Sequence, residues 1–271
     1  MCGQVGVIFG RKRRRAEERE HLARLFTRLL LLSEELGPHA TGAAWLNRDG
    51  EYHLFKRPLT ATQFINDKGF GELLAGIDNR TTVLLGHTRW RTRGDEQVNQ
   101  NNHPIRAGKV IGTHNGTIYN ADYLFRRYKL PRFAEVDSEL LLRLADNAFR
   151  NGRLNMDRFK KRLRRCRGQI TAVMACRTEP GTVFLLKGNK PLEAWWNKRM
   201  RAVLYASDPL YLDAVLTGDS DWREITVPPM TMMVFRHEDL FRFSVEPFTF
   251  LTQESKGRKH DTINVAQGNM Q

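Results

Sequence analysis

The sequence predicts an α+β fold built on antiparallel sheets. Short segments rich in β-branched and aromatic residues recur along the chain and end at Gly, Asp or Pro, whereas few stretches show the apolar spacing of a helix. Consecutive strands are mostly separated by short turns, which join antiparallel neighbours. The chain has 271 residues and is 41% hydrophobic, so it can bury a core in one large domain or two small ones.

The expected strands share a composition that suits a pleated, half-buried surface. They are Gly6–Phe9, Thr41–Asn47, Tyr52–Lys56, Val83–His87, Val110–His114, Ile170–Cys176, Val183–Lys187, Val203–Ala206, Glu224–Val227, Met230–Arg236 and Phe241–Val245.

Three stretches predict helices. Glu17–Leu36 has leucines at helical spacing and stops at a Gly-Pro pair. Glu139–Arg150 follows two candidate capping residues, Asp137 and Ser138, and Met156–Arg167 follows Asn155, a third candidate. We expect one domain over residues 1–250 and a flexible tail over 251–271, because the last residues are polar and aperiodic.

The composition predicts a cytoplasmic protein. No apolar run is long enough to cross a bilayer, and the N-terminus lacks the apolar core of a signal peptide. The chain has three cysteines, too few for a disulfide framework. Of these, Cys166 is expected at the surface and Cys176 in the core.

The formal net charge of +14 comes largely from two basic runs, Arg11–Arg15 and Arg150–Arg167. A positive surface attracts polyanions, so a contact with nucleic acid or a nucleotide is one interpretation. The other is a solvated helix face or loop without a partner. Neither run contains interleaved aromatic residues on which bases could stack.

The opening stretch "MCGQVGVIF" offers a candidate nucleophile, Cys2. If Met1 is removed, one residue carries both a thiol and a free α-amine. The amine titrates at roughly 7.7–8.0 and an unperturbed thiol at about 8.5, so the amine can accept the thiol proton without a separate histidine. One residue would then supply both nucleophile and base.

Three further stretches contain candidate substrate contacts. In "GHTRWRTRG", Arg89 at a strand end could hold a carboxylate with two parallel hydrogen bonds and Thr92 could add a third; alternatively, Arg89 simply packs on Trp90. In "GTHNGTIYN", Asn115 and Gly116 are either a hairpin turn or two donors aimed at an oxyanion. In "EVDSELL", Asp137 either caps its helix or binds an ammonium group.

Together these stretches resemble the class II glutamine amidotransferase family, with the glutaminase domain of glucosamine-6-phosphate synthase nearest in pattern. The resemblance rests on the N-terminal Cys-Gly, "GHTRW", "NNHP", "HNGTIYN" and "VDSE", and continues through "KGNKPLE" and "YASDPLYL". It implies the N-terminal nucleophile fold, a four-layer αββα sandwich of two antiparallel sheets. The chain departs from the family pattern at Arg93, where the pattern has His, and at Pro38–Thr41.

The resemblance also implies roles. Cys2 would be the nucleophile, and Asn115 and Gly116 the oxyanion hole. Arg89 and Thr92 would hold the α-carboxylate of L-glutamine, Asp137 its α-ammonium group, and Trp90 would line the pocket. Glutamine would give glutamate and ammonia through a thioester, with no cofactor and no metal.

We expect a separate ammonia-accepting enzyme, because the resemblance ends before any domain that would consume ammonia. A free-standing glutaminase or amidase is an alternative, and so is a catalytically silent module that senses glutamine. A metal site formed by His87, His103 and His114 is disfavoured, since all three lie in motifs that need no metal.

Overall fold

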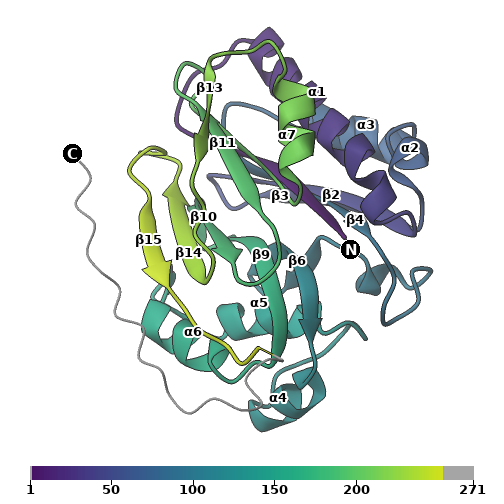
Figure 1. Ribbon diagram of the computed structural model, residues 1–271, viewed down its shortest axis with the longest axis vertical. Coiled ribbons are helices and arrows are strands. Elements are labelled where there is room, and N and C mark those ends of the chain that lie inside the picture. The colour runs from purple at the N-terminus through teal and green to yellow at the C-terminus, as the bar shows by residue number, and fades with distance from the viewer. Residues whose placement is uncertain (1, 253–271) are drawn as a thin grey trace.

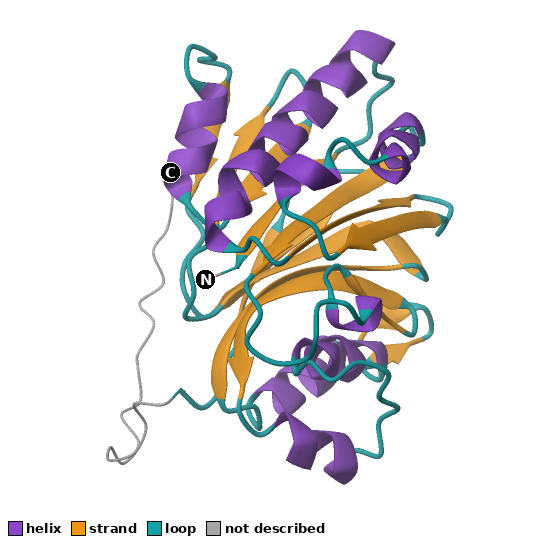
Figure 2. Cartoon of the chain, turned by 90° about the vertical axis from the view of Figure 1, so that its right-hand side faces the viewer, coloured by secondary structure: helices purple, strands orange, loops and turns teal. Residues whose placement is uncertain are grey.

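The protein consists of two antiparallel sheets packed face to face between two layers of helices (Figures 1 and 2). A computed structural model describes residues 2–252. The predicted α+β class and the four-layer sandwich are both confirmed. Most of the predicted tail, residues 253–271, lies outside the described residues, but Leu251 still pairs with Arg167.

The first sheet has the strand order β13-β11-β12-β1-β4-β2-β3. Its strands are β1 (Gly3–Phe9), β2 (Ala40–Asn47), β3 (Tyr52–Arg57), β4 (Thr81–Arg89), β11 (Glu193–Asn197), β12 (Ala202–Ala206) and β13 (Trp222–Ile225). The strand that begins the chain therefore lies in the interior of this sheet, hydrogen-bonded to β12 on one side and β4 on the other.

The second sheet has the order β15-β14-β10-β9-β6-β5. Its strands are β5 (Ile105–Ala107), β6 (Val110–Ile118), β9 (Gly168–Cys176), β10 (Glu179–Lys187), β14 (Thr231–Arg236) and β15 (Ser244–Pro247). A small hairpin of β7 (Phe149–Arg150) and β8 (Arg153–Leu154) stands apart from both sheets.

The helices cover the two outer faces (Figure 2). Over the first sheet lie α1 (Ala16–Leu32), the 3₁₀ turn η1 (Ser33–Leu36), α2 (Ala61–Phe64), α3 (Lys68–Ala75) and α7 (Pro209–Leu216). Over the second lie α4 (Ala121–Arg127), α5 (Ser138–Asp146) and α6 (Met156–Leu163), and η2 (Asn99–Asn101) sits in the loop after β4. Among residues 2–252, no helix is long and apolar enough to span a bilayer.

Alternation along the strands creates three apolar layers. In β1, Val5, Val7 and Phe9 point towards the helices, whereas Ile8 points towards the other sheet. The layer between the sheets also contains Val83 from the first sheet. Each side chain of a strand therefore belongs to either a helix–sheet or a sheet–sheet core, as the two-residue period of a strand requires.

Several expected boundaries were wrong. The helix predicted over Glu139–Arg150 ends at Asp146, because the chain turns into β7, and the strand predicted over Phe241–Val245 is β15, Ser244–Pro247. The sequence analysis missed four strands, β5, β7, β8 and β11, and four short helices, α2, α3, α4 and α7. Helices of about two turns or fewer show too little periodicity to be recognised, and packing stabilises them.

Capping and burial brought further corrections. Asn155 caps α6 as predicted, its side chain accepting a hydrogen bond from the Arg158 N–H at 2.9 Å. Neither Asp137 nor Ser138 caps α5, since both side chains bond to β6 instead. Cys166 is buried, contrary to the expected surface position, and burial raises its pKa to about 12.

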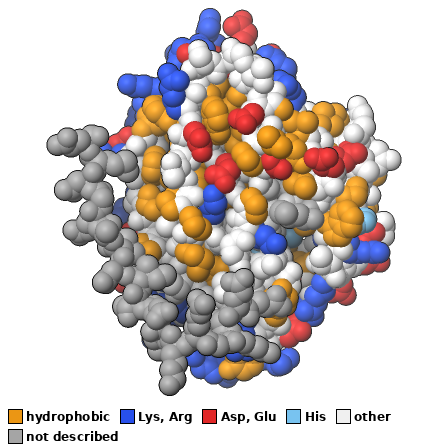
Figure 3. Space-filling model, in the orientation of Figure 1, with side chains coloured by type: hydrophobic (Ala, Val, Ile, Leu, Met, Phe, Trp, Pro, Cys, Tyr) orange, Lys and Arg blue, Asp and Glu red, His pale blue; other side chains and the backbone are white. Residues whose placement is uncertain are grey.

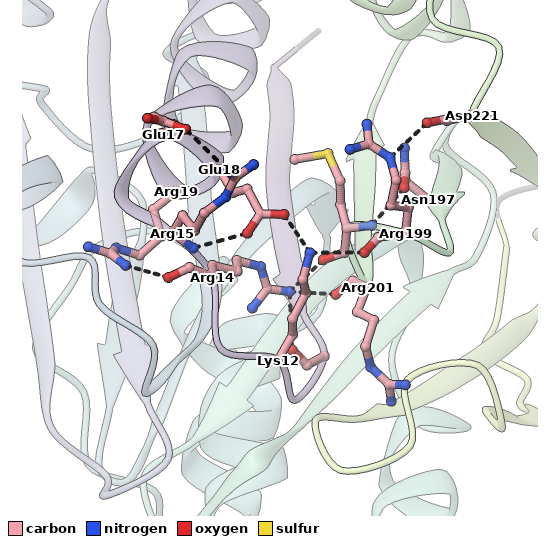
Figure 4. A network of polar contacts seen from close by, with 12 residues as sticks. Lys12, Arg14, Arg15, Glu17, Glu18, Arg19, Asn197, Arg199, Arg201 and Asp221 are labelled. Atoms are coloured by element: carbon pink, nitrogen blue, oxygen red, sulfur yellow. Dashed lines mark hydrogen bonds and ion pairs between the residues drawn. The ribbon is translucent and has the colours of Figure 1, made fainter.

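The first basic run is partly a structural element (Figure 4). The buried Arg14 guanidinium donates to the carbonyls of Gly10, Met200 and Arg201 at 3.1, 2.9 and 2.7 Å, so it ties the loop after β1 to the turn before β12. Lys12 pairs with Glu18 at the start of α1. The first basic run is therefore not simply a solvated segment, because Arg14 and Lys12 have partners within the protein.

Replacing Arg14 with Ala should destabilise the protein by about 2–4 kcal/mol, because three buried carbonyls lose their charged donor. Chemical denaturation monitored by circular dichroism measures the change. The matched control is Arg13→Ala, an exposed neighbour, which should shift stability by less than about 0.5 kcal/mol. Equal effects of the two substitutions would contradict the structural role of Arg14.

Candidate active site

Strand register brings the ends of three strands together. β1 runs antiparallel to β4, with Gly3 opposite Thr88, so the residue before β1 lies beside the residues that end β4. β12 runs antiparallel to β1 on the other side and ends at Ala206. Cys2, just before β1, therefore lies at the same edge of the sheet as Arg89, the last residue of β4, and Trp90, which follows it.

The Cys2 thiol lies against the backbone of Trp90. Its Sγ accepts the Trp90 N–H at 3.2 Å and stands 3.6 Å from the Trp90 carbonyl oxygen. Burial raises the pKa of this thiol, an effect partly offset by the Trp90 N–H. The resting group is therefore a thiol rather than a thiolate, and its use as a nucleophile requires a base.

Asn115 joins the two sheets at this point. Its Nδ2 donates to the Cys2 carbonyl at 2.7 Å and to Ser207 Oγ at 2.8 Å. Its Oδ1 lies 3.2 Å from His87 Nε2, and because a carbonyl oxygen only accepts, this ring nitrogen carries the proton. The buried histidine thereby fixes which end of the amide faces Cys2.

The pair Asn115–Gly116 lies inside β6 and is not a hairpin turn, so that alternative is wrong. Gly116 has φ of 134°, and a Cβ at this position would stand 2.1 Å from the Gln169 carbonyl oxygen of β9. Both facts require glycine here. The backbone of β6 can therefore approach β9 closely, directly after the amide that faces Cys2.

Arg89 is buried and fixes the loop that follows it. Its Nη1 donates to Asn102 Oδ1 at 2.7 Å, and its Nη2 donates to the carbonyls of Arg93 and Gly94. Of the five N–H groups of the Arg89 guanidinium, only the Nε–H and one Nη1–H form no hydrogen bond within residues 2–252. The arginine thus has a structural function beyond the clamp that the sequence suggested.

The rim of the site is formed by Trp90 and the segment that departs from the family pattern. Trp90 is 46% exposed and packs edge-on against His39, with ring centroids 5.2 Å apart. His39 Nδ1 also accepts the Arg91 N–H at 3.0 Å. Thr92 lies exposed in the bend beyond, and Arg93 pairs with Asp122 at 3.2 Å.

Asp137 faces the strand that contains Asn115. Its Oδ2 accepts the Ile118 N–H, and it is close enough to Cys2 to raise the pKa of that thiol. The sequence-predicted residues therefore gather at one end of the sandwich, except that no contact of the Thr92 side chain places it with them. A hollow lined by Arg93, Gly94 and 132–135 opens beside the loop that Arg89 holds.

Three buried histidines lie behind this site. His87 stacks on His103 with ring centroids 4.2 Å apart, and His114 Nδ1 lies 2.9 Å from Ser138 Oγ. Burial lowers the pKa of His87 to about 3 and lowers the pKa values of His103 and His114 as well. Among residues 2–252, no group of His, Cys, Asp or Glu side chains is arranged to hold a metal ion.

The amino-acid sequence is similar to those of known proteins. The chain is 33% identical over 203 residues to a glutamine–fructose-6-phosphate aminotransferase of Mycolicibacterium paratuberculosis, covering 71% of this chain and 30% of that protein. It is 25% identical over 218 residues to a 7-cyano-7-deazaguanine synthase of Sulfolobus acidocaldarius, covering 79% and 44%. No protein-family model matches.

A solved glutamine phosphoribosylpyrophosphate amidotransferase from B. subtilis superposes with a TM-score of 0.67 at 18% identity, over 92% of this chain and 49% of that one. The fold and the aligned sequences indicate the same family. The chain belongs to the class II glutamine amidotransferase family. The match concerns a domain, since this amidotransferase chain spans less than half the length of the curated relatives described above.

The structure adds functional candidates that the sequence analysis did not single out. Ser207 bridges Asn115 and Gln4, donating to the Gln4 carbonyl at 3.3 Å and accepting the Gln4 N–H at 2.8 Å. His87 holds the Asn115 amide from the opposite side. Both residues stand in motifs that carried the resemblance, "YASDPLYL" and "GHTRW", but no pattern in either motif reveals a partner 92 or 28 positions away.

The buried histidines predict an acid-sensitive fold. A histidine is half-protonated near pH 6.5 in an unfolded chain, whereas the folded protein holds these rings neutral. Their contribution to stability is complete above about pH 6.5 and is lost as the pH falls from there towards 3, because only the unfolded state binds the protons.

The variant His103→Met tests this without breaking a hydrogen bond, since neither ring nitrogen of His103 has a partner within residues 2–252. We expect its melting temperature to fall less steeply than that of the parent protein between about pH 6.5 and 4. His21→Gln on α1 is the control. Curves that run parallel for His103→Met and the parent protein would refute the assignment.

Proposed function

We propose that this domain hydrolyses the side-chain amide of glutamine through a thioester on Cys2, giving glutamate and ammonia. The observation that carries the proposal is the convergence of Cys2, Trp90 and Asn115 from three separate segments of the chain. The name of the glutamine–fructose-6-phosphate aminotransferase relative includes glutamine, which supports this choice of substrate.

In the proposed reaction, Cys2 Sγ attacks the amide carbon of glutamine. The thiol proton moves to the α-amine of Cys2, freed by removal of Met1, and from there to the departing nitrogen, so that ammonia leaves and a glutamyl thioester remains. Water then attacks the thioester and returns the thiol. The raised pKa of Cys2 explains why the reaction needs this base.

Asn115 Nδ2 and the Gly116 N–H are the proposed oxyanion donors. Because both Nδ2 hydrogens already bond to the Cys2 carbonyl and Ser207, a substrate oxyanion would compete with the Cys2 carbonyl for one of them. His87 and Ser207 keep the amide correctly oriented during that exchange. Catalysis would then depend on two residues that do not touch the substrate.

Arg89 and Asp137 are the proposed contacts for the two charged groups of the amino acid. The remaining Nη1–H of Arg89, together with the Thr92 hydroxyl, would receive the α-carboxylate. The Asp137 oxygen that does not accept the Ile118 N–H would receive the α-ammonium group. Trp90, with its exposed ring, would line the entrance.

We also propose a separate acceptor enzyme for the ammonia, with the reaction in the cytoplasm. The names of the relatives, an aminotransferase and a synthase, point to use of the nitrogen in synthesis. Slow glutamine turnover by the isolated chain, accelerated by a synthase from the same source, would support this arrangement. Fast turnover that no synthase changes would instead indicate a free-standing glutaminase.

The substitution Cys2→Ala should abolish glutamine hydrolysis, by roughly 10⁴-fold or more, with little change in melting temperature. Glutamate release measures the rate, and intact mass shows whether the active protein begins at Cys2. Cys176→Ala, which removes a buried thiol distant in sequence, should retain activity. A fully active protein that still carries Met1 would exclude the proposed base.

The substitution Arg89→Lys should raise the KM for glutamine roughly 10-fold or more and change kcat less, because a compact ammonium group cannot reach the loop carbonyls and a substrate carboxylate at once as the planar guanidinium does. Arg91→Lys is the matched control, an exposed arginine two residues further along that pairs with Glu96. Melting temperatures separate weaker binding from a loosened loop. An unchanged KM in a stable Arg89→Lys protein would remove Arg89 from the substrate site.

A further inference from the structure

The second basic run, Arg150–Arg167, differs from the first in which of its charged side chains have partners within the protein. Lys160 pairs with Glu246, and the Arg162 guanidinium donates to the Leu144 carbonyl and lies over the Tyr128 ring. By contrast, the exposed side chains of Arg165 and Arg167 form no ion pair with any carboxylate of residues 2–252. The end of this run therefore presents uncompensated charge to solvent.

Tertiary structure brings a second basic segment beside it. The Asn120 side chain, just before α4, donates to the Arg165 carbonyl at 2.8 Å and accepts the Arg167 N–H at 2.9 Å. These bonds hold α4, with its exposed Arg126 and Arg127, against the end of the basic run. Figure 3 shows basic side chains at this lower end of the molecule, where α4 lies in Figure 1.

Two exposed tyrosines stand among these cations. Tyr119 is 53% exposed, and its N–H donates to the Arg167 carbonyl at 2.9 Å. Tyr123 is 51% exposed, and its hydroxyl oxygen accepts a hydrogen bond from Arg127 Nη1 at 3.2 Å. The aromatic residue of the basic run, Phe159, is buried, so the exposed aromatic rings come from the residue after β6 and from α4.

A hollow of about 320 Å³ opens between these groups. Its lining consists of Asn120, Tyr123, Leu124, Arg127, Arg165, Arg167 and Leu251. It combines guanidinium groups, a tyrosine ring and two leucines, and no carboxylate of residues 2–252 lines it. Such a lining suits a phosphate group followed by a planar base better than an acidic peptide, which offers carboxylates but no ring to stack.

We infer that the surface formed by Tyr119, Tyr123, Arg127, Arg165 and Arg167 binds single-stranded nucleic acid. The arginines neutralise successive phosphates and release counterions, and the tyrosine rings stack on bases. A single strand is favoured over a duplex because a paired base does not expose its face to a ring at the surface. This inference does not depend on hydrolysis of glutamine.

The test is fluorescence anisotropy of the full chain with a labelled single strand of about 20 nucleotides, longer than the roughly 4–16 nucleotides that one binding fold covers. DNA and RNA strands of one sequence, the DNA duplex and polyglutamate are the probes. We expect both single strands to bind more tightly than the duplex or polyglutamate. Equal binding of all four probes, or no binding at about 0.1 M salt, would overturn the proposal.

Two double variants test which basic run contacts the nucleic acid. The double variant Arg165→Ala, Arg167→Ala should lose about 25-fold in affinity at 0.1 M salt and lower the salt slope by about 1.4, as removal of two phosphate contacts requires. Arg13→Ala with Arg15→Ala removes the same charge from the first basic run and should change affinity little. Equal losses in the two double variants would show that net charge alone drives binding.

Two variants of Tyr123 test the stacking contact. Tyr123→Ala should lose roughly 10-fold in affinity, whereas Tyr123→Phe, which keeps the ring and loses only the hydroxyl, should bind as the parent protein does. The same two proteins should hydrolyse glutamine at the parent rate. Identical affinities for Tyr123→Ala and the parent protein would contradict the stacking contact.

Discussion

The hydrogen bond from the Asn115 side chain to the Cys2 carbonyl connects the two sheets at the end where the candidate active site lies. A second bond beside it, from Gln4 Nε2 to Thr113 Oγ1 at 2.6 Å, joins the same two strands, β1 and β6. Farther from this edge, the interface is an apolar layer that includes Ile8, Val83 and Val173. The two sheets are thus held by dispersion and hydrophobic burial along most of their length and by directed bonds at the site.

Burial makes this polar edge expensive, and the protein satisfies most of it internally. Asn115, Ser207 and Gln4 exchange hydrogen bonds with one another, which compensates most of their desolvation. Within residues 2–252, the Gln4 Oε1 still has no partner, and neither do the His87 Nδ1 and both ring nitrogens of His103. Held neutral, these rings cost less than a charge would in the same place. The candidate active site therefore depends on a sheet edge that becomes less stable in acid.

The two basic runs are similar in sequence but differ in how their charges are compensated in the folded protein. In the first, Arg14 is turned inward and donates to three backbone carbonyls, and Arg15 pairs with Glu17 (Figure 4). Arg11 pairs with Glu238. In the second, the last arginines face solvent beside tyrosines contributed by other segments. Charge counts along the chain cannot separate these cases, because compensation depends on neighbours far away in sequence.

The sequence alone determined the fold class, the nucleophile candidate and most of the site list, because strand composition, helix stops and short motifs are local properties of the chain. It also allowed the glycine at 116 to be singled out, either as part of a turn or as an oxyanion donor, but not as a strand residue pressed against Gln169. Only the tertiary structure decided what each side chain does. Asp137 turned from its helix to the Ile118 N–H, Arg89 became the anchor of its own loop, and His87 and Ser207 emerged as the supports of Asn115. The physical reason is that a hydrogen bond depends on distance and direction in space, and the partners of these residues lie from 4 to 92 positions away along the chain.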